Sequence, residues 1–164
     1  MESLYDFFAK FESDSNQFFQ IANYLKSVFI ATGVAIISNE KDMTYTTIEE
    51  IGIEEGKEKV LRPIVEYTKS LEKNFSLSKI LGCNDEELKL LKKDGIKTFL
   101  CIPIFQNSKM EETKIQGFLY IESKNIINDI SESAIKKAEP VLKMLKILFE
   151  NENLKKSSYI DSLT

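Results

Sequence analysis

The stretch Gly95-Ile96-Lys97-Thr98-Phe99-Leu100-Cys101-Ile102-Pro103-Ile104 decides the fold. Residues 96–105 form a nearly unbroken apolar run, which is typical of a strand buried in a sheet. The polar residues 106–113 have the length of a hairpin loop. Residues 114–123 then alternate between apolar and other residues and predict a second strand. Because so short a loop joins antiparallel neighbours, the sheet is predicted to be antiparallel.

The rest of the chain adds a second hairpin and several helices. Residues 34–38 predict a buried strand, 39–42 a turn and 43–51 its partner, and a short strand is expected at 75–81. Apolar residues at helical spacing predict helices over 4–11, 16–32 with Gly33 as its stop, 54–70 with Pro63 near its start or bending it, 84–94 and 131–157. The class is therefore α+β: an antiparallel five- to six-stranded sheet flanked by N-terminal helices and a long C-terminal helix.

The composition limits the classes of function. The chain has 164 residues, enough for one domain, and its 43% apolar and 29% charged residues exclude intrinsic disorder. It contains no His, which excludes Ser-His-Asp and Cys-His nucleophiles and His-ligated zinc or haem. A net charge of -4 gives no overall electrostatic attraction for the negative backbone of nucleic acid, so no nucleic-acid partner is expected.

The two cysteines, Cys83 and Cys101, make neither a disulfide framework nor a four-thiolate metal site. We therefore predict no metal and no cofactor. Cys101 lies in an apolar strand and is interpreted as a small core residue. Cys83 precedes a helix start, which favours a reactive thiol, but the acidic run 85–87 opposes this and favours a loop residue without a role.

The order of elements resembles a GAF domain, the small-molecule sensor fold related to PAS domains. Residues 95–104 are similar to the family's glycine followed by an apolar strand that ends in a proline and an aliphatic residue. Gln116-Gly117-Phe118-Leu119-Tyr120-Ile121 is similar to the next strand of the family, and Asp129-Ile130-Ser131 to the start of its last helix. The resemblance covers residues 16–150 and leaves residues 1–15 as an N-terminal helical segment.

The end of the chain carries a second resemblance. Asp161-Ser162-Leu163-Thr164, after a long helix, is similar to the opening of a GGDEF diguanylate cyclase domain. Residues 151–164 are then a signalling-helix linker that ends in the start of such a domain. The alternative is a chance match of four residues.

These resemblances imply a regulatory module of a bacterial cyclic di-GMP signalling protein, with catalysis outside this chain. It would bind a small ligand or a partner and control a GGDEF domain in cis. The alternative is a ligand-free dimerisation scaffold. A cysteine-dependent methionine sulfoxide reductase, an activity of one branch of the family, is a remote alternative.

The resemblance also implies where a ligand would lie, which in GAF domains is between one sheet face and the helices after the second strand. Most of the positions that we expect to face this pocket are apolar, so a small or weakly polar ligand, or none, is expected. These positions are Ile36, Tyr45, Val60, Ile64, Phe75, Leu88, Leu91, Thr98 and Tyr120.

Two apolar helix faces predict a homodimer. One is formed by Leu4, Phe7, Phe8 and Phe11, and the other is a heptad-like seam of Ala138, Leu142, Leu145 and Phe149. Packing of these side chains within their own chain is the alternative for both faces.

No membrane or export segment is predicted. The apolar runs 28–37 and 99–105 are shorter than the roughly 20 residues of a spanning helix. The N-terminus lacks the basic and apolar regions of a signal peptide. We therefore expect no membrane insertion and a cytoplasmic location.

Overall fold

A five-stranded antiparallel sheet in the order β2-β1-β5-β4-β3 forms the centre of the molecule. The computed structural model describes Phe7 and residues 16–41, 44–53, 58–71, 75–76, 95–105, 115–124, 136 and 138–151. The strands are β1 (Gly33–Lys41), β2 (Thr44–Ile51), β3 (Phe75–Ser76), β4 (Thr98–Phe105) and β5 (Ile115–Ser123). The predicted α+β class and its antiparallel sheet are confirmed.

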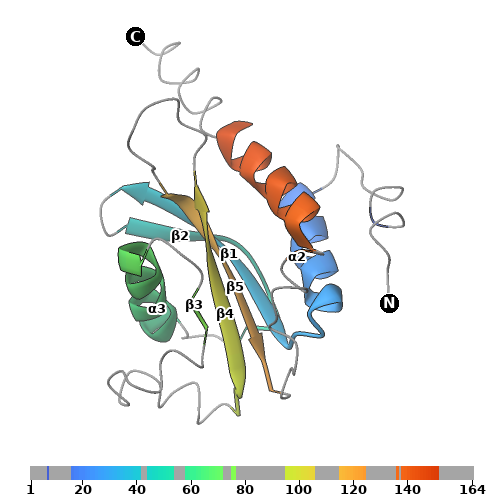
Figure 1. The fold of residues 1–164 in the computed structure, drawn as a ribbon, viewed down its shortest axis with the longest axis vertical. Helices are drawn as coiled ribbons and strands as arrows, with labels where there is room; N and C mark the ends of the chain where they lie inside the picture. The colour runs from blue at the N-terminus through green and yellow to red at the C-terminus, as the bar shows by residue number, and fades with distance from the viewer. Residues whose placement is uncertain are drawn as a thin grey trace.

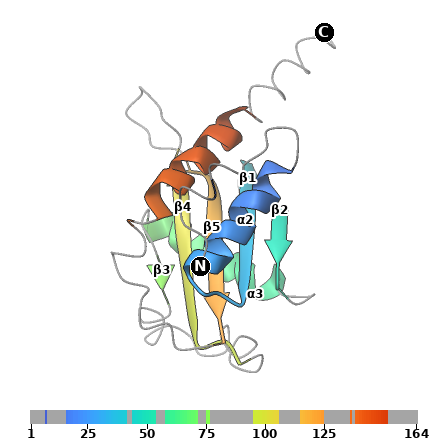
Figure 2. The same ribbon diagram turned by 90° about the vertical axis from the view of Figure 1, so that its right-hand side faces the viewer.

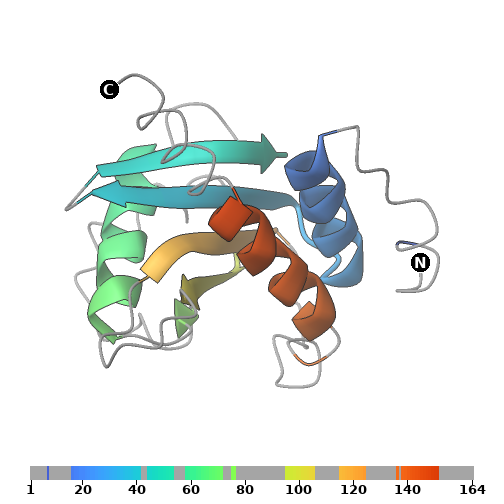
Figure 3. The same cartoon turned by 90° about the horizontal axis from the view of Figure 1, so that it is seen from above.

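Helices cover both faces of this sheet. Helix α2 (Gln17–Val28) and the C-terminal helix, residues 138–151, lie on one face, and helix α3 (Glu58–Leu71) lies on the other (Figure 1). Figure 2 shows α2 and the C-terminal helix crossing the front of the sheet with α3 behind it, and Figure 3 shows the same layers from above. Because both faces are covered, the central strands β4 and β5 are buried along nearly their whole length.

The ends of α2 follow from local chemistry. Asn16 caps its start, because the Asn16 side-chain oxygen accepts a hydrogen bond of 3.1 Å from the Phe19 backbone N–H. At the other end Ile30 donates to the Ser27 carbonyl at 3.2 Å and Ala31 donates to the Lys26 carbonyl at 2.9 Å. These two bonds form a Schellman motif, in which the residue at the Ile30 position adopts a left-handed conformation. Ile30 has φ 51° accordingly.

The predicted end of this helix was wrong. It was expected to reach Thr32 and to stop at Gly33, but it ends at Val28 and Gly33 is the first residue of β1. The sequence did not indicate this end, because the left-handed position after the helix is usually glycine and is here the β-branched Ile30.

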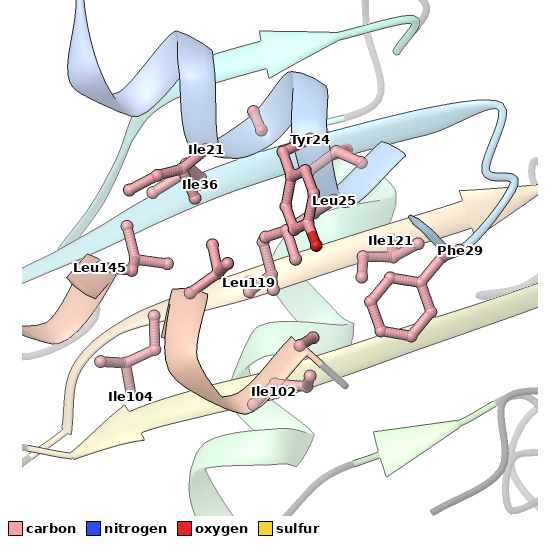
Figure 4. Close-up of a cluster of buried hydrophobic side chains, with 14 of the residues drawn as sticks. Ile21, Tyr24, Leu25, Phe29, Ile36, Ile102, Ile104, Leu119, Ile121 and Leu145 are labelled. Carbon is pink, nitrogen blue, oxygen red and sulfur yellow. The ribbon is translucent and has the colours of Figure 1, made fainter. Parts of the chain in front are cut away.

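The face covered by α2 and the C-terminal helix carries the larger core, which we call the α2-side core. Side chains from α2, β1, β4, β5 and the C-terminal helix converge there (Figure 4). Each fully buried aliphatic or aromatic side chain contributes about 1.5–3 kcal/mol, so this core fixes both helices on the sheet. Its buried members are Phe7, Ile21, Ala22, Tyr24, Leu25, Phe29, Val34, Ile36, Leu100, Ile102, Ile104, Leu119, Ile121, Ala138, Val141, Leu145 and Phe149.

The other predicted elements are found in part. Helix α3 contains Pro63 inside the helix, and the strand expected at 75–81 is described only as β3. The helices expected at 4–11 and 84–94 lie outside the described residues, apart from Phe7, which is helical.

Candidate ligand-binding face

The sheet face beneath α3 has a separate core, the α3-side core. It joins Leu61, Ile64 and Val65 of α3 to alternate residues of β1, β4 and β5. Its buried strand and loop residues are Ala35, Ile37, Ile96, Phe99, Cys101, Phe118 and Tyr120, and Tyr45, Ile53 and Ile115 pack against it half-buried. Among the described residues, this core holds three places where polar atoms meet the apolar interior.

The first polar place is a carboxylate held by a phenol. The Tyr120 hydroxyl donates a hydrogen bond of 2.7 Å to Glu122 Oε2, and both side chains are almost completely buried. They lie two residues apart on β5 and therefore share one sheet face. The Tyr120 ring also packs at 6.1 Å between centroids from Phe99 of β4. The hydrogen bond holds the buried Glu122 carboxyl group in one position, at the end of the sheet face where Glu122 pairs with Gly33.

The second polar place is the Cys101 thiol. Burial raises the pKa of Cys101 to about 12, and a side-chain hydrogen bond with Thr68 acts in the opposite direction. Thr68 also donates a hydrogen bond of 2.7 Å to the Ile64 carbonyl within α3. At neutral pH the thiol therefore stays protonated and is a poor nucleophile or metal ligand.

The third polar place lies at the opposite end of the face, where β1 ends and β5 begins. Asn39 pairs with Tyr45 across β1 and β2, and the Tyr45 ring meets Phe118 edge-on at 5.8 Å between centroids. Asn39 Nδ2 donates a hydrogen bond of 2.9 Å to the Ile115 carbonyl. Gln116 lies two residues before Phe118 on β5, at a break in the register with β4, and is buried.

The structure brings some of the predicted pocket residues together on this face. Tyr45, Ile64 and Tyr120 belong to the α3-side core. Val60 lies in α3 and Phe75 in β3, where its backbone pairs with Cys101. Leu88 and Leu91 lie outside the described residues.

Two of the predicted pocket positions lie on the other face. Ile36 belongs to the α2-side core, and Thr98 shares the strand phase of Leu100, which also belongs there. The correction for Ile36 is a shift of one residue, because its neighbour Ile37 packs beneath α3.

Of the residues predicted to form dimer contacts, the described ones pack within their own chain. Phe7 is buried, and its ring lies 4.4 Å between centroids from the ring of Tyr24. Ala138, Leu145 and Phe149 are buried in the α2-side core, and Leu142 packs against it half-buried. For these residues the structure shows the packing within one chain that the sequence left open. Leu4, Phe8 and Phe11 lie outside the described residues.

Sequence reasoning missed Asn39, Gln116 and Glu122. A signal for Glu122 was present, because Tyr120 and Glu122 share a face in a strand with few other polar residues. Gln116 lies at a break in the register between β4 and β5, which no residue pattern marks.

The described part of the chain offers no metal-binding chemistry, since no group of three or more Cys, Asp or Glu side chains comes together there. Cys101 is the free cysteine of this part, and Cys83 lies outside it. No helix in the described ranges is long and apolar enough to cross a membrane.

Comparison with known proteins shows the class of fold. No protein-family model and no curated protein matches the sequence. The structure, however, is similar to several GAF domains. One, from an Acinetobacter phosphoenolpyruvate-protein phosphotransferase, has a TM-score of 0.65 at 15% identity, with 92% of each chain covered.

Two further similar structures come from different protein contexts. A GAF domain/HD domain protein from Geobacter sulfurreducens gives a TM-score of 0.63 at 11% identity, covering 84% of this chain and 92% of that one. The photoproduct state of a GAF domain from Synechocystis gives 0.61 at 15% identity, covering 85% and 95%. The chain therefore has the fold of a GAF domain.

Proposed function

We propose that this chain is a sensory GAF domain, in which a small ligand on the α3 face changes the position of the C-terminal helix. The observation that carries the proposal is the two-sided role of β5. Phe118 and Tyr120 pack beneath α3, while Leu119 and Ile121 pack beneath α2 and the C-terminal helix. A displacement of β5 would therefore change the packing on both faces of the sheet.

The contact between β5 and the C-terminal helix is close. An added Cβ at Gly117 would lie 2.7 Å from Phe149 Cζ and 2.5 Å from the Ile37 carbonyl oxygen. The Phe149 ring thus lies directly against the strand backbone. Because interiors are tightly packed, a small shift of β5 must be accommodated by the helix.

The output proposed for this movement is a GGDEF diguanylate cyclase domain that follows in cis. Its support is the resemblance of residues 161–164 to the opening of that domain, and the known structures with this fold include a GAF domain/HD domain protein. Catalysis would then lie outside this chain, in the cytoplasm. A homodimer would bring two such output domains together. Among the described helical residues, Phe19 of α2 and Ile147 of the C-terminal helix are large apolar side chains exposed to solvent.

A ligand-free dimerisation scaffold is the second candidate. It is favoured by the large side chains that fill the α3-side core, because Phe99, Phe118 and Tyr120 are completely buried there. The buried polar atoms of Gln116 and Asn39 that have no hydrogen-bond partner among the described residues favour the sensor instead.

Native mass spectrometry of the purified chain distinguishes the two candidates. A sensor is expected to carry additional mass that is lost on denaturation, whereas a scaffold gives the bare multiple of its 18.9 kDa chain. The same spectrum reads the oligomeric state. A bare monomer at micromolar concentration would contradict both the ligand and the dimer.

A further inference from the structure

Edge strand β2 contains a β-bulge at Ile48. Ile37 of β1 pairs with Thr47. The neighbouring Ile36 pairs with Glu49, so Ile48 has no opposite residue on β1. A bulge changes the direction in which the side chains beside it point, and it is usually a built feature of a fold rather than a defect. The residue whose direction this bulge sets is Glu49.

The bulge decides on which face of the sheet Glu49 lies. Residues that are directly opposite each other on paired strands share a face. Ile36 belongs to the α2-side core, so its partner Glu49 lies on the α2 face, where Ile48 packs as well. Without the additional residue, regular pairing from Ile37 onward would place Glu49 opposite Ala35, in the α3-side core. The bulge therefore turns two successive side chains toward α2.

Glu49 contacts α2 at the start of the helix. Its Oε2 accepts a hydrogen bond of 3.1 Å from Nδ2 of Asn16, which is the N-cap residue. The first turn of α2 contains no acidic residue of its own. Because a helix N-terminus has a partial positive charge, a carboxylate beside it is stabilising. Strand β2 thus supplies the negative charge that the first turn of the helix lacks.

The Asn16 amide joins the helix cap and the contact with β2 in one side chain. Its Oδ1 accepts a hydrogen bond of 3.1 Å from the Phe19 backbone N–H, which leaves Nδ2 facing Glu49. The two bonds use the two ends of the same planar amide. The orientation that caps α2 is therefore also the orientation that holds β2, and a change at either element reaches the other.

We propose that Asn16 and Glu49 form a latch that makes edge strand β2 and the start of α2 move as one unit. Strand β2 also reaches the α3 face, where the Tyr45 ring meets Phe118 edge-on. The latch thus connects the two faces through the edge of the sheet, in addition to β5. It goes beyond the proposed function and holds whether or not a ligand binds. One hydrogen bond contributes far less than the stability of a whole domain, so the latch opens much more often than the chain unfolds.

Amide hydrogen exchange of the ¹⁵N-labelled chain, followed by NMR at neutral pH, measures how often the latch opens. Asn16→Ser keeps an oxygen that caps α2 but removes the donor to Glu49. We expect the Phe19 amide and the paired amides of β2 to exchange about fivefold faster in this variant, the size expected for one hydrogen bond. The β2 amides are the decisive readout, because Glu49 lies 33 residues from Asn16 and a change confined to the helix cap would not reach it.

An exchange of the two chemical groups gives a sharper test. Asp and Asn are equally good N-caps, so Asn16→Asp alone would be harmless if this residue served only the helix. With Glu49 opposite, the variant brings two carboxylates together, and we expect the Phe19 amide to exchange about tenfold faster than in the wild type. Combined with Glu49→Gln, it restores a carboxylate and an amide donor in reversed order, and exchange should return close to the wild-type rate.

Glu50→Gln is the matched control. Glu50 follows Glu49 in the same strand, but it is exposed and pairs with Ala35, on the α3 face. This variant should leave exchange of the Phe19 amide unchanged, and the same acceleration here would reduce the effect to general electrostatics and overturn the latch. Unchanged β2 exchange in Asn16→Ser, or a double variant as fast as Asn16→Asp alone, would also overturn it. These experiments need no ligand, so their outcome is separable from that of the sensory function.

Discussion

At the scale of single residues, Ile30 is the clearest point of strain. It has φ 51° at the end of α2, and 66% of it is exposed. The left-handed conformation costs an L-residue about 1–2 kcal/mol, and this residue gains little from burial in return. The chain keeps a poor residue at a position that the Schellman motif reserves for glycine.

Replacement of Ile30 by glycine is therefore expected to stabilise the protein. We expect Ile30→Gly to raise the free energy of unfolding by about 1 kcal/mol, because relief of the strained φ outweighs the greater freedom of glycine in the unfolded chain. Urea denaturation measures this change. Ile30→Val keeps the branched Cβ and serves as the matched control, with no gain expected. A loss of stability in Ile30→Gly would show that the isoleucine side chain holds the loop.

Cys101 gives the protein a dependence on alkaline pH. The pKa of Cys101 in the folded chain is about 12, above that of a thiol in the unfolded chain. Its contribution to the free energy of unfolding is therefore fully present below about pH 8.5, where the thiol is protonated in both states. As pH rises above this value, only the unfolded chain loses the proton. Stability then falls by about 1.4 kcal/mol per pH unit until the folded pKa is reached.

The comparison with Cys101→Ala isolates this effect from the titration of Tyr and Lys. At pH 7 the variant is expected to be less stable than the wild type by about 1 kcal/mol, since it leaves a small cavity. From pH 9 to pH 11 the difference should shrink and change sign. Thermal unfolding at several pH values measures it, and a difference that stays constant would show that the thiol ionises equally in both states.

At the scale of elements, Gly117 sets how closely the C-terminal helix approaches β5. Gly117→Ala is expected to cost about 3 kcal/mol, because its Cβ would overlap both the Ile37 carbonyl and the Phe149 ring. Combined with Phe149→Leu, which frees one of these two contacts, the loss should be smaller than the sum of the single losses. Denaturant titration of the three variants measures the coupling. Additive losses would mean that helix and strand do not share this contact.

The elements were predictable to the extent that hydrophobic periodicity marks them. The hairpin expected at 96–105 and 114–123 is present as β4 and β5, because two apolar strands around a polar loop have few other solutions. The phase of β1 was not predictable. With helices on both faces, Ile36 and Ile37 are both apolar and both buried, so residue type does not tell the sides apart.

The same limit applies to the helices. The stripe of Ala138, Leu145 and Phe149 was predicted to contact a second subunit, with packing in its own chain as the alternative, and the structure buries it in the α2-side core. An apolar stripe has the same spacing whether it covers its own sheet or a second subunit. The register break at Gln116 was not predictable either, because it becomes visible only when β4 and β5 are paired.

At the scale of the whole molecule, the proposed output depends on the phase of the C-terminal helix. One residue inserted after Glu150 in the full-length protein rotates whatever follows by about 100°. Seven inserted residues leave a difference of only about 20°. We expect diguanylate cyclase activity to change strongly with the first insertion and weakly with the second. Equal activities would indicate a flexible tether.

The central position of β5 also has a consequence for synthesis on the ribosome. β1 pairs on one side with β2, the next strand in the chain, but on the other side with β5, from Gly33 opposite Glu122 to Ser38 opposite Gly117. More than seventy residues separate the end of β1 from the start of β5. At about 5–20 residues per second, the nascent chain presents an open apolar strand edge for roughly 4–15 seconds before its partner emerges. We therefore expect an interval during synthesis in which the unpaired edge of β1 is exposed to aggregation.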